Sequence, residues 1–136
     1  MTRYVMALVE HHGSFITLLK KTGPESILGK LNGVGGKAGG DEAPVAAMNR
    51  EWEEETGISM SFSNCCWGNL SGKGWEMFVF YKRADQRFAL PEVNDAGEPL
   101  FWSSEYEMLE HGVPNLRWMI PMCRQKTFFH CWEWPL

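Results

Sequence analysis

The first part of the chain alternates between apolar runs and short polar breaks, as β-strands and their turns do. Two apolar runs span Tyr4–His11 and Phe15–Thr22, and His12-Gly13-Ser14 separates them. Because glycine and serine favour tight turns, the pattern predicts a hairpin. Gly23-Pro24-Glu25-Ser26 then indicates a loop. A short extended piece over Leu31–Gly35 is expected to lead into a glycine-rich turn.

Two more strands are predicted in the middle of the chain. They span Ser61–Leu70 and Trp75–Lys82, and Ser71-Gly72-Lys73-Gly74 joins them. In the second run both alternating sets of positions are apolar: Met77, Val79 and Tyr81 on one side, Phe78 and Phe80 on the other. A strand with two apolar faces is buried on both, so we expect layers of structure on both sides of the sheet.

Apolar positions three and four residues apart predict one long helix over Pro44–Thr56. The stripe consists of Val45, Ala47, Met48 and Trp52. Proline suits the first helical position because its missing N–H has no partner there, and Gly57 suits the left-handed residue that follows a helix. Ala43, at the expected N-cap, has no side-chain acceptor. Asp41 or Glu42 is therefore expected to satisfy the free amides, or the first turn frays.

The remaining pattern predicts a mixed series of short elements. Asp85–Pro99 is polar with two prolines and is expected to be a surface loop. Beyond it we expect a strand over Leu100–Trp102 and then a helix over Ser104–His111, capped by Ser103 or Ser104. A second helix is expected over Asn115–Arg124, which Pro121 kinks or ends early, and an edge strand within Thr127–Trp134.

Strands on both sides of a central helix predict an α/β fold, a mixed sheet between helices. No repeat or linker interrupts the chain, so a single domain over residues 1–136 is expected.

The central helix carries the clearest chemical signal. Residues three and four apart share a helix face, so Glu51, Glu54 and Glu55 are expected to form one patch. Carboxylates without His or Cys are hard oxygen ligands that suit Mg²⁺, Mn²⁺ or Ca²⁺. Mg²⁺ keeps several waters and also recruits substrate phosphates, so the patch predicts a phosphorylated substrate and hydrolysis at phosphorus.

A solvated helix face is the ordinary interpretation of such a charge run. The spacing argues against it, because Gly36 precedes Glu42 by six residues, Glu42 precedes Arg50 by eight, and Gly57 ends the helix. The glycine-rich stretch before the helix is not a nucleotide P-loop, since Leu31 and Ala38 stand where that motif requires glycine and serine or threonine. A dinucleotide-binding glycine motif also fits poorly, because an acid-rich helix follows it.

Composition narrows the class of partner. A chain of 136 residues with 44% hydrophobic residues suffices for one compact core. The net charge of −4 argues against binding a nucleic acid polymer, which normally requires a basic face, but it permits a small nucleotide carried in with its metal. No apolar run is long enough for a membrane span and no leader pattern is present, so a cytoplasmic protein with free cysteines is expected. A monomer and a homodimer both stay open.

The segment from Gly36 to Ile58 resembles the Nudix box, G-x5-E-x7-R-E-U-x-E-E-x-G-U, where U is a bulky apolar residue and Trp52 fills the first U. The resemblance implies a Nudix hydrolase with an α/β/α fold that cleaves a nucleoside diphosphate linked to another group. It implies that Glu51, Glu54, Glu55 and the backbone carbonyl of Gly36 bind the divalent metal. It also implies that Arg50 orients the helix acids and that Glu42 pairs with Arg50.

The likeness extends beyond the box to the MutT-type, 8-oxoguanine nucleotide diphosphatase branch. Residues 30–37 resemble that branch's approach to the box, and residues 114–121 with Phe129-His130 resemble its C-terminal helix and tail. This implies Asn32 and Asn115 as base-binding residues. The branch has an acid at the position of Asn115 and a second acid at that of Leu116, so the departure puts a preference for oxidised guanine in doubt. Ala38-Gly39-Gly40 also replaces the commoner Ile-Glu-Pro.

Other side chains complete the expected site. Lys37 is the best-placed lysine for a phosphate, ahead of Lys20 and Lys21. Asp95 or Glu98 is a candidate for a further metal ligand or for the general base. The tryptophans that could stack on a base are Trp67, Trp75, Trp102 and Trp118, although core packing is the commoner role.

The expected reaction is attack of water on a nucleoside triphosphate, aligned by one to three Mg²⁺ with Mn²⁺ as a substitute, giving a nucleoside monophosphate and pyrophosphate. The alternatives are hydrolysis of ADP-ribose, a dinucleotide or a nucleotide sugar, and a non-catalytic nucleotide-sensing domain.

Overall fold

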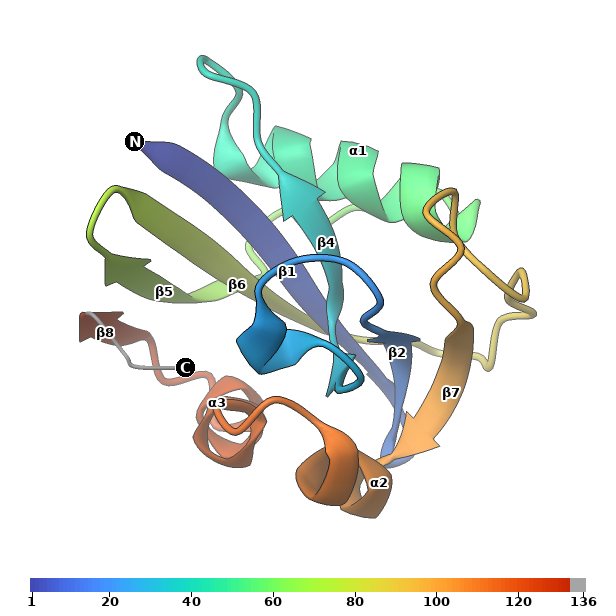
Figure 1. Cartoon of the computed structure of the whole chain (residues 1–136). Helices are drawn as coiled ribbons and strands as arrows, with labels where there is room; N and C mark the ends of the chain where they lie inside the picture. Colours follow the sequence, from blue (N-terminus) through green and yellow to red (C-terminus); the bar gives the residue numbers. More distant parts are fainter. Residues whose placement is uncertain (133–136) are drawn as a thin grey trace.

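The computed structural model describes residues 1–132 and consists of a mixed eight-stranded sheet between helices (Figure 1). The strands are β1 (Thr2–His11), β2 (Ser14–Leu19), β3 (Leu31–Asn32), β4 (Val34–Lys37), β5 (Cys66–Gly72), β6 (Trp75–Arg83), β7 (Leu100–Ser104) and β8 (Phe129–Trp132). The helices are α1 (Pro44–Thr56), α2 (Glu105–His111), α3 (Leu116–Arg124) and a short 3₁₀ turn, η1 (Glu25–Ile27). The predicted α/β sandwich is confirmed.

Strand β1 organises the sheet, whose order is β3-β2-β1-β6-β5-β8. It runs parallel to β6 along its whole length, and β5 runs parallel to β8. On its other edge β1 has two antiparallel partners. Its residues Tyr4–Ala7 pair with β4, and its last two residues continue into the hairpin with β2. β2 then pairs with β7 as well as β3, so the sheet splits at this edge.

Helices cover both faces of the sheet, as the two apolar faces of β6 predict. α1 packs against β1 and β4 on one side, while α3 packs against β5 and β6 on the other, and α2 lies beside β7 (Figure 1). The core beneath α1 includes Trp52, which is fully buried between Phe62 and neighbouring strands. The core beneath α3 includes Leu8, Val79 and Met119.

The first hairpin has the turn that the sequence predicts. His11 pairs with Ser14, so His12 and Gly13 form a two-residue loop, with φ of 46° and 83° respectively. Two positive φ angles define the turn whose twist matches that of the flanking strands. The expected extent of the second strand is wrong at its end, because β2 stops at Leu19 rather than Thr22.

The predicted start of β5 is also wrong. Residues 61–65 form an irregular segment, and the strand begins only at Cys66. The cause is Phe62, which is buried between Trp52 and Phe80, while its backbone N–H donates to the Asn49 side chain on α1 at 2.8 Å. Tertiary packing here overrides the local strand pattern. The same hairpin turns at residues 73–74, because Gly72 still pairs with Trp75.

The extended piece before the box consists of two strands rather than one. Leu31 and Asn32 pair with β2, whereas Val34–Lys37 pair with β1, and Gly33 makes the transfer between partners. A Cβ on Gly35 would collide with the backbone oxygen of Val5, so the close approach of β4 to β1 requires glycine there.

The helix boundaries agree with the sequence to within a residue. α1 spans Pro44–Thr56, Gly57 follows with φ of 74°, and Ala43 provides no side-chain cap, as expected. Ser104 caps α2 through a capping box with Glu107. α3 continues through Pro121 to Arg124, so the proline does not end it. β8 falls within the predicted C-terminal strand, although residues 133–134 of that prediction lie outside the described residues.

Candidate active site

The acid-rich face of α1 lies against the glycine-rich strand β4. Gly36 is so close to Glu51 that a Cβ at residue 36 would overlap the Glu51 carboxylate. The helix and strand meet because Ala47 and Met48, four and three residues before Glu51 on the same side of α1, are fully buried in the core. Glu51 itself is nearly buried, whereas the Glu54 side chain is about half exposed, at 54%. Gly36 and the Glu51 carboxylate therefore lie against each other on one side of the site.

Arg50 connects the acids of the site to each other. Its Nε and Nη2 donate to the two oxygens of Glu42, at 2.8 and 2.9 Å, in a bidentate pair. Nη1 donates to Glu51 at 3.0 Å and to Glu54 at 3.1 Å. Nη2 also reaches the backbone oxygen of Lys37 at 3.1 Å, which ties β4 to the helix. One planar guanidinium thus fixes three carboxylates and a strand.

This arrangement shifts the pKa of the residues around it. The hydrogen bonds from Arg50, with one from the Gly39 amide, lower the pKa of Glu42 to about 2, and the same pairing raises the pKa of Arg50. Burial raises the pKa of Glu51 above its ordinary value, although Arg50 opposes that effect. The Glu42–Arg50 pair is therefore fully charged at neutral pH, while Glu51 is a carboxylate whose negative charge is poorly solvated.

Glu55 is held from the opposite direction by the long loop before β7. The Asn94 side-chain amide donates to Glu55 at 2.5 Å and also to Glu98 at 3.0 Å. Burial raises the pKa of Glu55, and the charges of Glu51 and Glu98 raise it further, against the hydrogen bond from Asn94. Asn94 therefore joins the helix acids to the loop.

Glu98 anchors that loop to the end of β2. Its carboxylate accepts from the backbone amides of Lys21 and Thr22 and forms an ion pair with Lys20 at 3.3 Å. Burial alone would raise the pKa of Glu98, but the hydrogen bonds from Lys21 and Asn94 and the charge of Lys20 lower it to about 2. Of the two acids proposed from the loop, Glu98 thus reaches the site, whereas Asp95 is exposed.

The sequence predicted neither Asn94 nor the backbone amides of residues 21–22 as part of the site. Asn94 is 39 residues from Glu55 in the chain. The one local signal was the turn composition Asn-Asp-Ala-Gly, and the Gly97 amide does donate to the Asn94 backbone oxygen. That signal indicates a turn but not its position against α1. Lys20 is engaged by Glu98 and so does not have the free ammonium that a phosphate contact needs.

A divalent cation fits the chemistry of the α1 carboxylates, because their metal-coordinating atoms are all oxygens. The fit is incomplete in geometry: among residues 1–132, no group of three His, Cys, Asp or Glu side chains is arranged to hold a metal ion. Arg50 lies between Glu51 and Glu54, and Asn94 holds Glu55 aside. Mg²⁺ is usually held by only one or two carboxylates and several waters. The Glu51 carboxylate, which lies against Gly36, is of the kind that Mg²⁺ uses in this way.

The two predicted base-binding residues, Asn32 and Asn115, lie on neighbouring segments. These segments meet at the start of the glycine-rich stretch, at the opposite end from Gly36. The Val113 amide donates to the Leu31 carbonyl at 3.0 Å, which brings the segments of Asn32 and Asn115 together. Asn115 is 4% exposed, and its Oδ1 is buried without a hydrogen-bond partner among the described residues. A buried acceptor without a partner is costly in a folded protein, so it points to a donor that a ligand would bring.

The other proposed binding residues are less closely placed. The Asn32 Oδ1 accepts from the Gly33 amide at 2.9 Å. Trp118, three residues after Asn115 on α3, packs edge-on against Phe129 with ring centroids 5.2 Å apart. Lys37 is exposed beside Gly36, and its ammonium forms no hydrogen bond or ion pair within residues 1–132. Trp102 lies apart from these residues, since its indole donates to Phe88.

Comparison with known proteins decides the family. A sequence model of the NUDIX domain matches residues 2–120, which is most of the chain and includes α1 and β4. The chain belongs to the Nudix family. A search of curated protein sequences returns no match. Among the described residues of this Nudix protein, no helix is both long and apolar enough to span a bilayer.

Solved structures share the fold at low sequence identity. A mutator MutT protein from Bacillus halodurans superposes with a TM-score of 0.73 and 23% identity, over 96% of this chain and 90% of that one. A bifunctional NMN adenylyltransferase/ADP-ribose pyrophosphatase from Francisella tularensis, complexed with AMP and Mn, gives 0.68 and 19%, over 92% and 41%. The NUDIX domain of Shewanella oneidensis NrtR, complexed with ADP-ribose, gives 0.70 and 12%, over 91% and 86%. The fold is therefore that of MutT-like Nudix proteins.

Proposed function

We propose that this protein, as a single Nudix domain, hydrolyses a nucleoside triphosphate to a nucleoside monophosphate and pyrophosphate. The observation that carries the proposal is that an acidic cluster and a buried, unpartnered hydrogen-bond acceptor lie at the two ends of the same short stretch of backbone. Gly36 and Glu51 form the acidic end, and the unpartnered Oδ1 of Asn115 lies near Asn32. Four residues separate Asn32 from Gly36, a span of about 13 Å in an extended strand.

The acidic end is suited to a polyphosphate bound with its metal. The residues that would hold a divalent cation are Glu51, Glu54, Glu55 and the Gly36 carbonyl, and the cation would polarise the phosphate and lower the pKa of a bound water. Arg50 orients Glu51 and Glu54 through hydrogen bonds to both carboxylates. Whichever of Glu51 and Glu55 the cation leaves uncoordinated accepts the proton of the attacking water. Lys37 contacts the polyphosphate from β4.

The base-binding end offers a hydrogen-bond acceptor to a base without specifying oxidised guanine. Asn115 offers one acceptor and one donor group, and its unpartnered acceptor is available to a donor on a ligand. An exocyclic amine or a ring N–H of a base provides that donor. Leu116 next to it is fully buried and adds no second polar group. Trp118 borders the same helix face three residues away.

A screen of purified protein with Mg²⁺ tests this function directly. Substrates should include ordinary and oxidised purine and pyrimidine triphosphates, with pyrophosphate and phosphate release scored separately. We expect pyrophosphate and a monophosphate from at least one purine triphosphate. Asn115→Ala should raise KM more than it lowers kcat, because the contact is to the base rather than to the reacting phosphorus. Release of phosphate alone would contradict the bond assignment.

Hydrolysis of ADP-ribose is the second candidate, and ADP-ribose should be added to the substrates of the same screen. It is favoured by the NrtR domain and the Francisella enzyme, whose solved structures contain ADP-ribose and AMP with Mn respectively. Both share less than a quarter of their residues with this chain, which supports the fold rather than the substrate. Formation of AMP from ADP-ribose, without cleavage of any triphosphate, would replace the first candidate by the second.

A further inference from the structure

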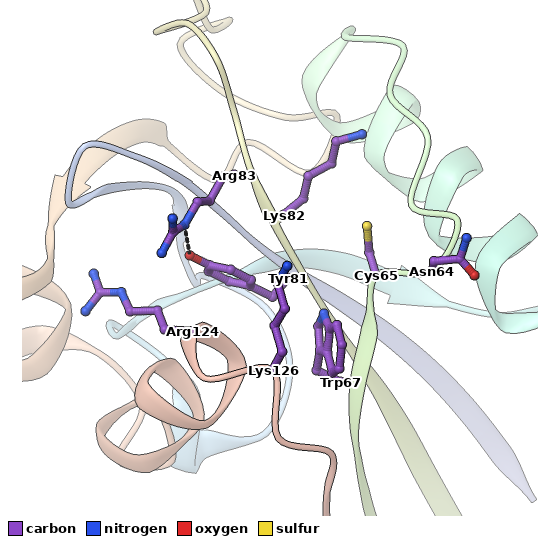
Figure 2. A pocket seen from close by; sticks show the side chains of 8 residues that line it. All are labelled: Asn64, Cys65, Trp67, Tyr81, Lys82, Arg83, Arg124 and Lys126. Atoms are coloured by element: carbon purple, nitrogen blue, oxygen red, sulfur yellow. Dashed lines mark hydrogen bonds between the residues drawn. The ribbon is translucent and has the colours of Figure 1, made fainter.

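A cavity lies between the ends of β5 and β6 and the segment that follows α3. Its volume is about 370 Å³, within the range of small-molecule sites. Figure 2 shows the side chains around it, which come from strands and loops distant in the sequence. They are Asn64, Cys65, Trp67, Tyr81, Lys82, Arg83, Arg124 and Lys126.

This cavity is separate from the candidate active site. Gly36 pairs with Val5 on β1, and Val5 pairs with Phe78 on β6. Arg83 is five residues further along β6, which corresponds to about 17 Å of strand. Tyr81 also faces the core beneath α3, whereas Glu51 belongs to α1 on the other side of the sheet. A ligand here would not touch the Nudix box.

Positive charge is concentrated around the cavity in a protein that is acidic as a whole. Four lining residues are lysine or arginine and none is aspartate or glutamate, although the chain has 17 acids against 13 bases. Arg124 is already engaged, because Glu10 and Glu105 both accept from its guanidinium. Lys82 donates to the backbone oxygen of Ser61 at 2.6 Å.

Two of the four cations have most of their donors free. Arg83 donates through Nε to the Tyr81 hydroxyl at 3.2 Å, the contact drawn in Figure 2. Its other nitrogens have no partner within the described part of the chain. Lys126 is exposed, and its ammonium has no hydrogen bond or ion pair with residues 1–132. An anion between them would meet charged donors that the protein leaves unused.

The backbone at the rim holds Lys126 in an uncommon conformation. Its φ is 53°, in the left-handed region that glycine adopts at a helix end, and its amide donates to the Cys123 oxygen at 3.0 Å. A lysine there costs about 1 kcal/mol or more relative to glycine. Asn64, on the opposite rim, is likewise left-handed with φ of 59°. Lys126 thus occupies a position where glycine would be more stable, and it places an ammonium at the cavity.

Trp67 adds an aromatic wall to this cationic site. Its indole is half-buried and borders the cavity beside Lys126 in Figure 2. A planar ring can stack on such a surface whatever its hydrogen-bonding pattern. We propose that the cavity binds a small phosphorylated compound with a planar ring, of the nucleoside monophosphate class. Its phosphate lies between Arg83 and Lys126 and its ring lies on Trp67. Binding there is independent of the hydrolysis proposed above.

The test is a metal-free titration of ¹⁵N-labelled protein, following the Trp67 indole N–H, which Trp67→Phe assigns. The probes are AMP, ribose 5-phosphate, adenosine and inorganic phosphate. We expect saturable shifts with AMP, and about tenfold weaker binding for ribose 5-phosphate or adenosine, since each lacks one of the two interactions. Phosphate binding as tightly as AMP would overturn the role of Trp67. The absence of any shift with AMP would overturn the site.

Lys126→Gly gives the sharpest variant, because it removes the ammonium while relieving the left-handed strain. It should unfold at equal or higher denaturant concentration than the parent protein, yet bind AMP about tenfold more weakly at Trp67. Arg83→Ala should weaken AMP binding to a similar extent. Lys73→Ala makes the same charge change on the exposed turn at the other end of β6 and should bind normally. Asn115→Ala should also leave the Trp67 shift intact. Normal binding by both Lys126→Gly and Arg83→Ala would refute the proposal.

Discussion

At the scale of single residues, Arg50 determines where the charges of the site lie. Its guanidinium contacts the side chains of Glu42, Glu51 and Glu54 and the carbonyl of Lys37. No lysine can reproduce this set of contacts, because an ammonium lacks the planar fork that pairs with both oxygens of Glu42. The orientation of the Glu54 carboxylate therefore depends on a neighbour in the same helix, and that of Glu51 depends on this neighbour as well as on packing against Gly36.

Arg50→Lys should accordingly lower activity without removing charge. We expect kcat to fall about 10–100-fold, as for other residues that orient metal ligands, with little change in KM for the nucleotide. Steady-state kinetics at saturating Mg²⁺ measure this effect. Arg117→Lys is the matched control, since Arg117 is exposed and makes only a 3.4 Å contact to Leu109. Equal kinetics for the two variants would show that Arg50 does not orient the acids.

At the scale of elements, the long loop before β7 is part of the site rather than a surface connection. Its residues Asn94 and Glu98 are 6% and 2% exposed, although the loop as a whole is polar. Asn94 supplies the amide that lies between the carboxylates of Glu55 and Glu98. The loop thus positions Glu55 while Glu98 fixes the loop to β2.

Replacing the Asn94 amide by a carboxylate should lower stability and activity more than removing the side chain does. Asn94→Asp would bring a third negative charge between Glu55 and Glu98, whereas Asn94→Ala removes three side-chain hydrogen bonds without adding charge. We expect Asn94→Asp to unfold at lower urea concentration than Asn94→Ala and to lose more activity, with part of the activity recovered at lower pH. If the two variants are equally stable and active, Asn94 does not mediate between the acids.

The elements also show which parts of the fold can be predicted from the sequence and which cannot. α1 was predicted to the residue because its signals are local: Pro44 starts it, an apolar stripe spans it, and Gly57 ends it. The start of β5 could not be predicted, because Phe62 contacts Trp52 through the fold rather than through a neighbour in sequence. The Nudix-box residues could be recognised because their spacing is local in the sequence. Asn94 could not be predicted, because its contact with Glu55 forms only when the loop packs against α1.

At the scale of the whole molecule, one buried acid ties the sheet to the helices on its second face. Glu10 on β1 accepts from Arg124 on α3 at 3.0 Å and from the Tyr81 hydroxyl on β6 at 2.6 Å. Burial alone would raise the pKa of Glu10, but the hydrogen bonds from Arg124 and Tyr81 outweigh it and hold the pKa below its ordinary value. A lowered native pKa stabilises the fold above the pKa of the unfolded chain, and that stability is lost as the pH falls through the native value.

Glu10→Gln should therefore lower the free energy of unfolding at pH 7, by about 2–4 kcal/mol for a partly buried ion pair that loses one partner. The difference between parent and variant should shrink below about pH 4.3, the ordinary pKa of a glutamate. Urea unfolding across pH 3–7 measures it. Glu110→Gln, at an exposed position on α2, should differ from the parent by about 0.5 kcal/mol or less. A difference for Glu10→Gln that is the same at every pH would contradict the assignment.

Binding of Mn²⁺, followed by the electron paramagnetic resonance signal of the free ion, tests the central claim most directly. The claim is that Glu51, Glu54 and Glu55 hold a divalent cation against the Gly36 carbonyl. We predict that the parent protein binds Mn²⁺ and that Glu51→Gln, Glu54→Gln and Glu55→Gln each weaken binding about 10–100-fold. Glu53→Gln, an exposed change on the same helix, should bind like the parent. Equal Mn²⁺ affinity in all four variants and the parent would contradict the claim.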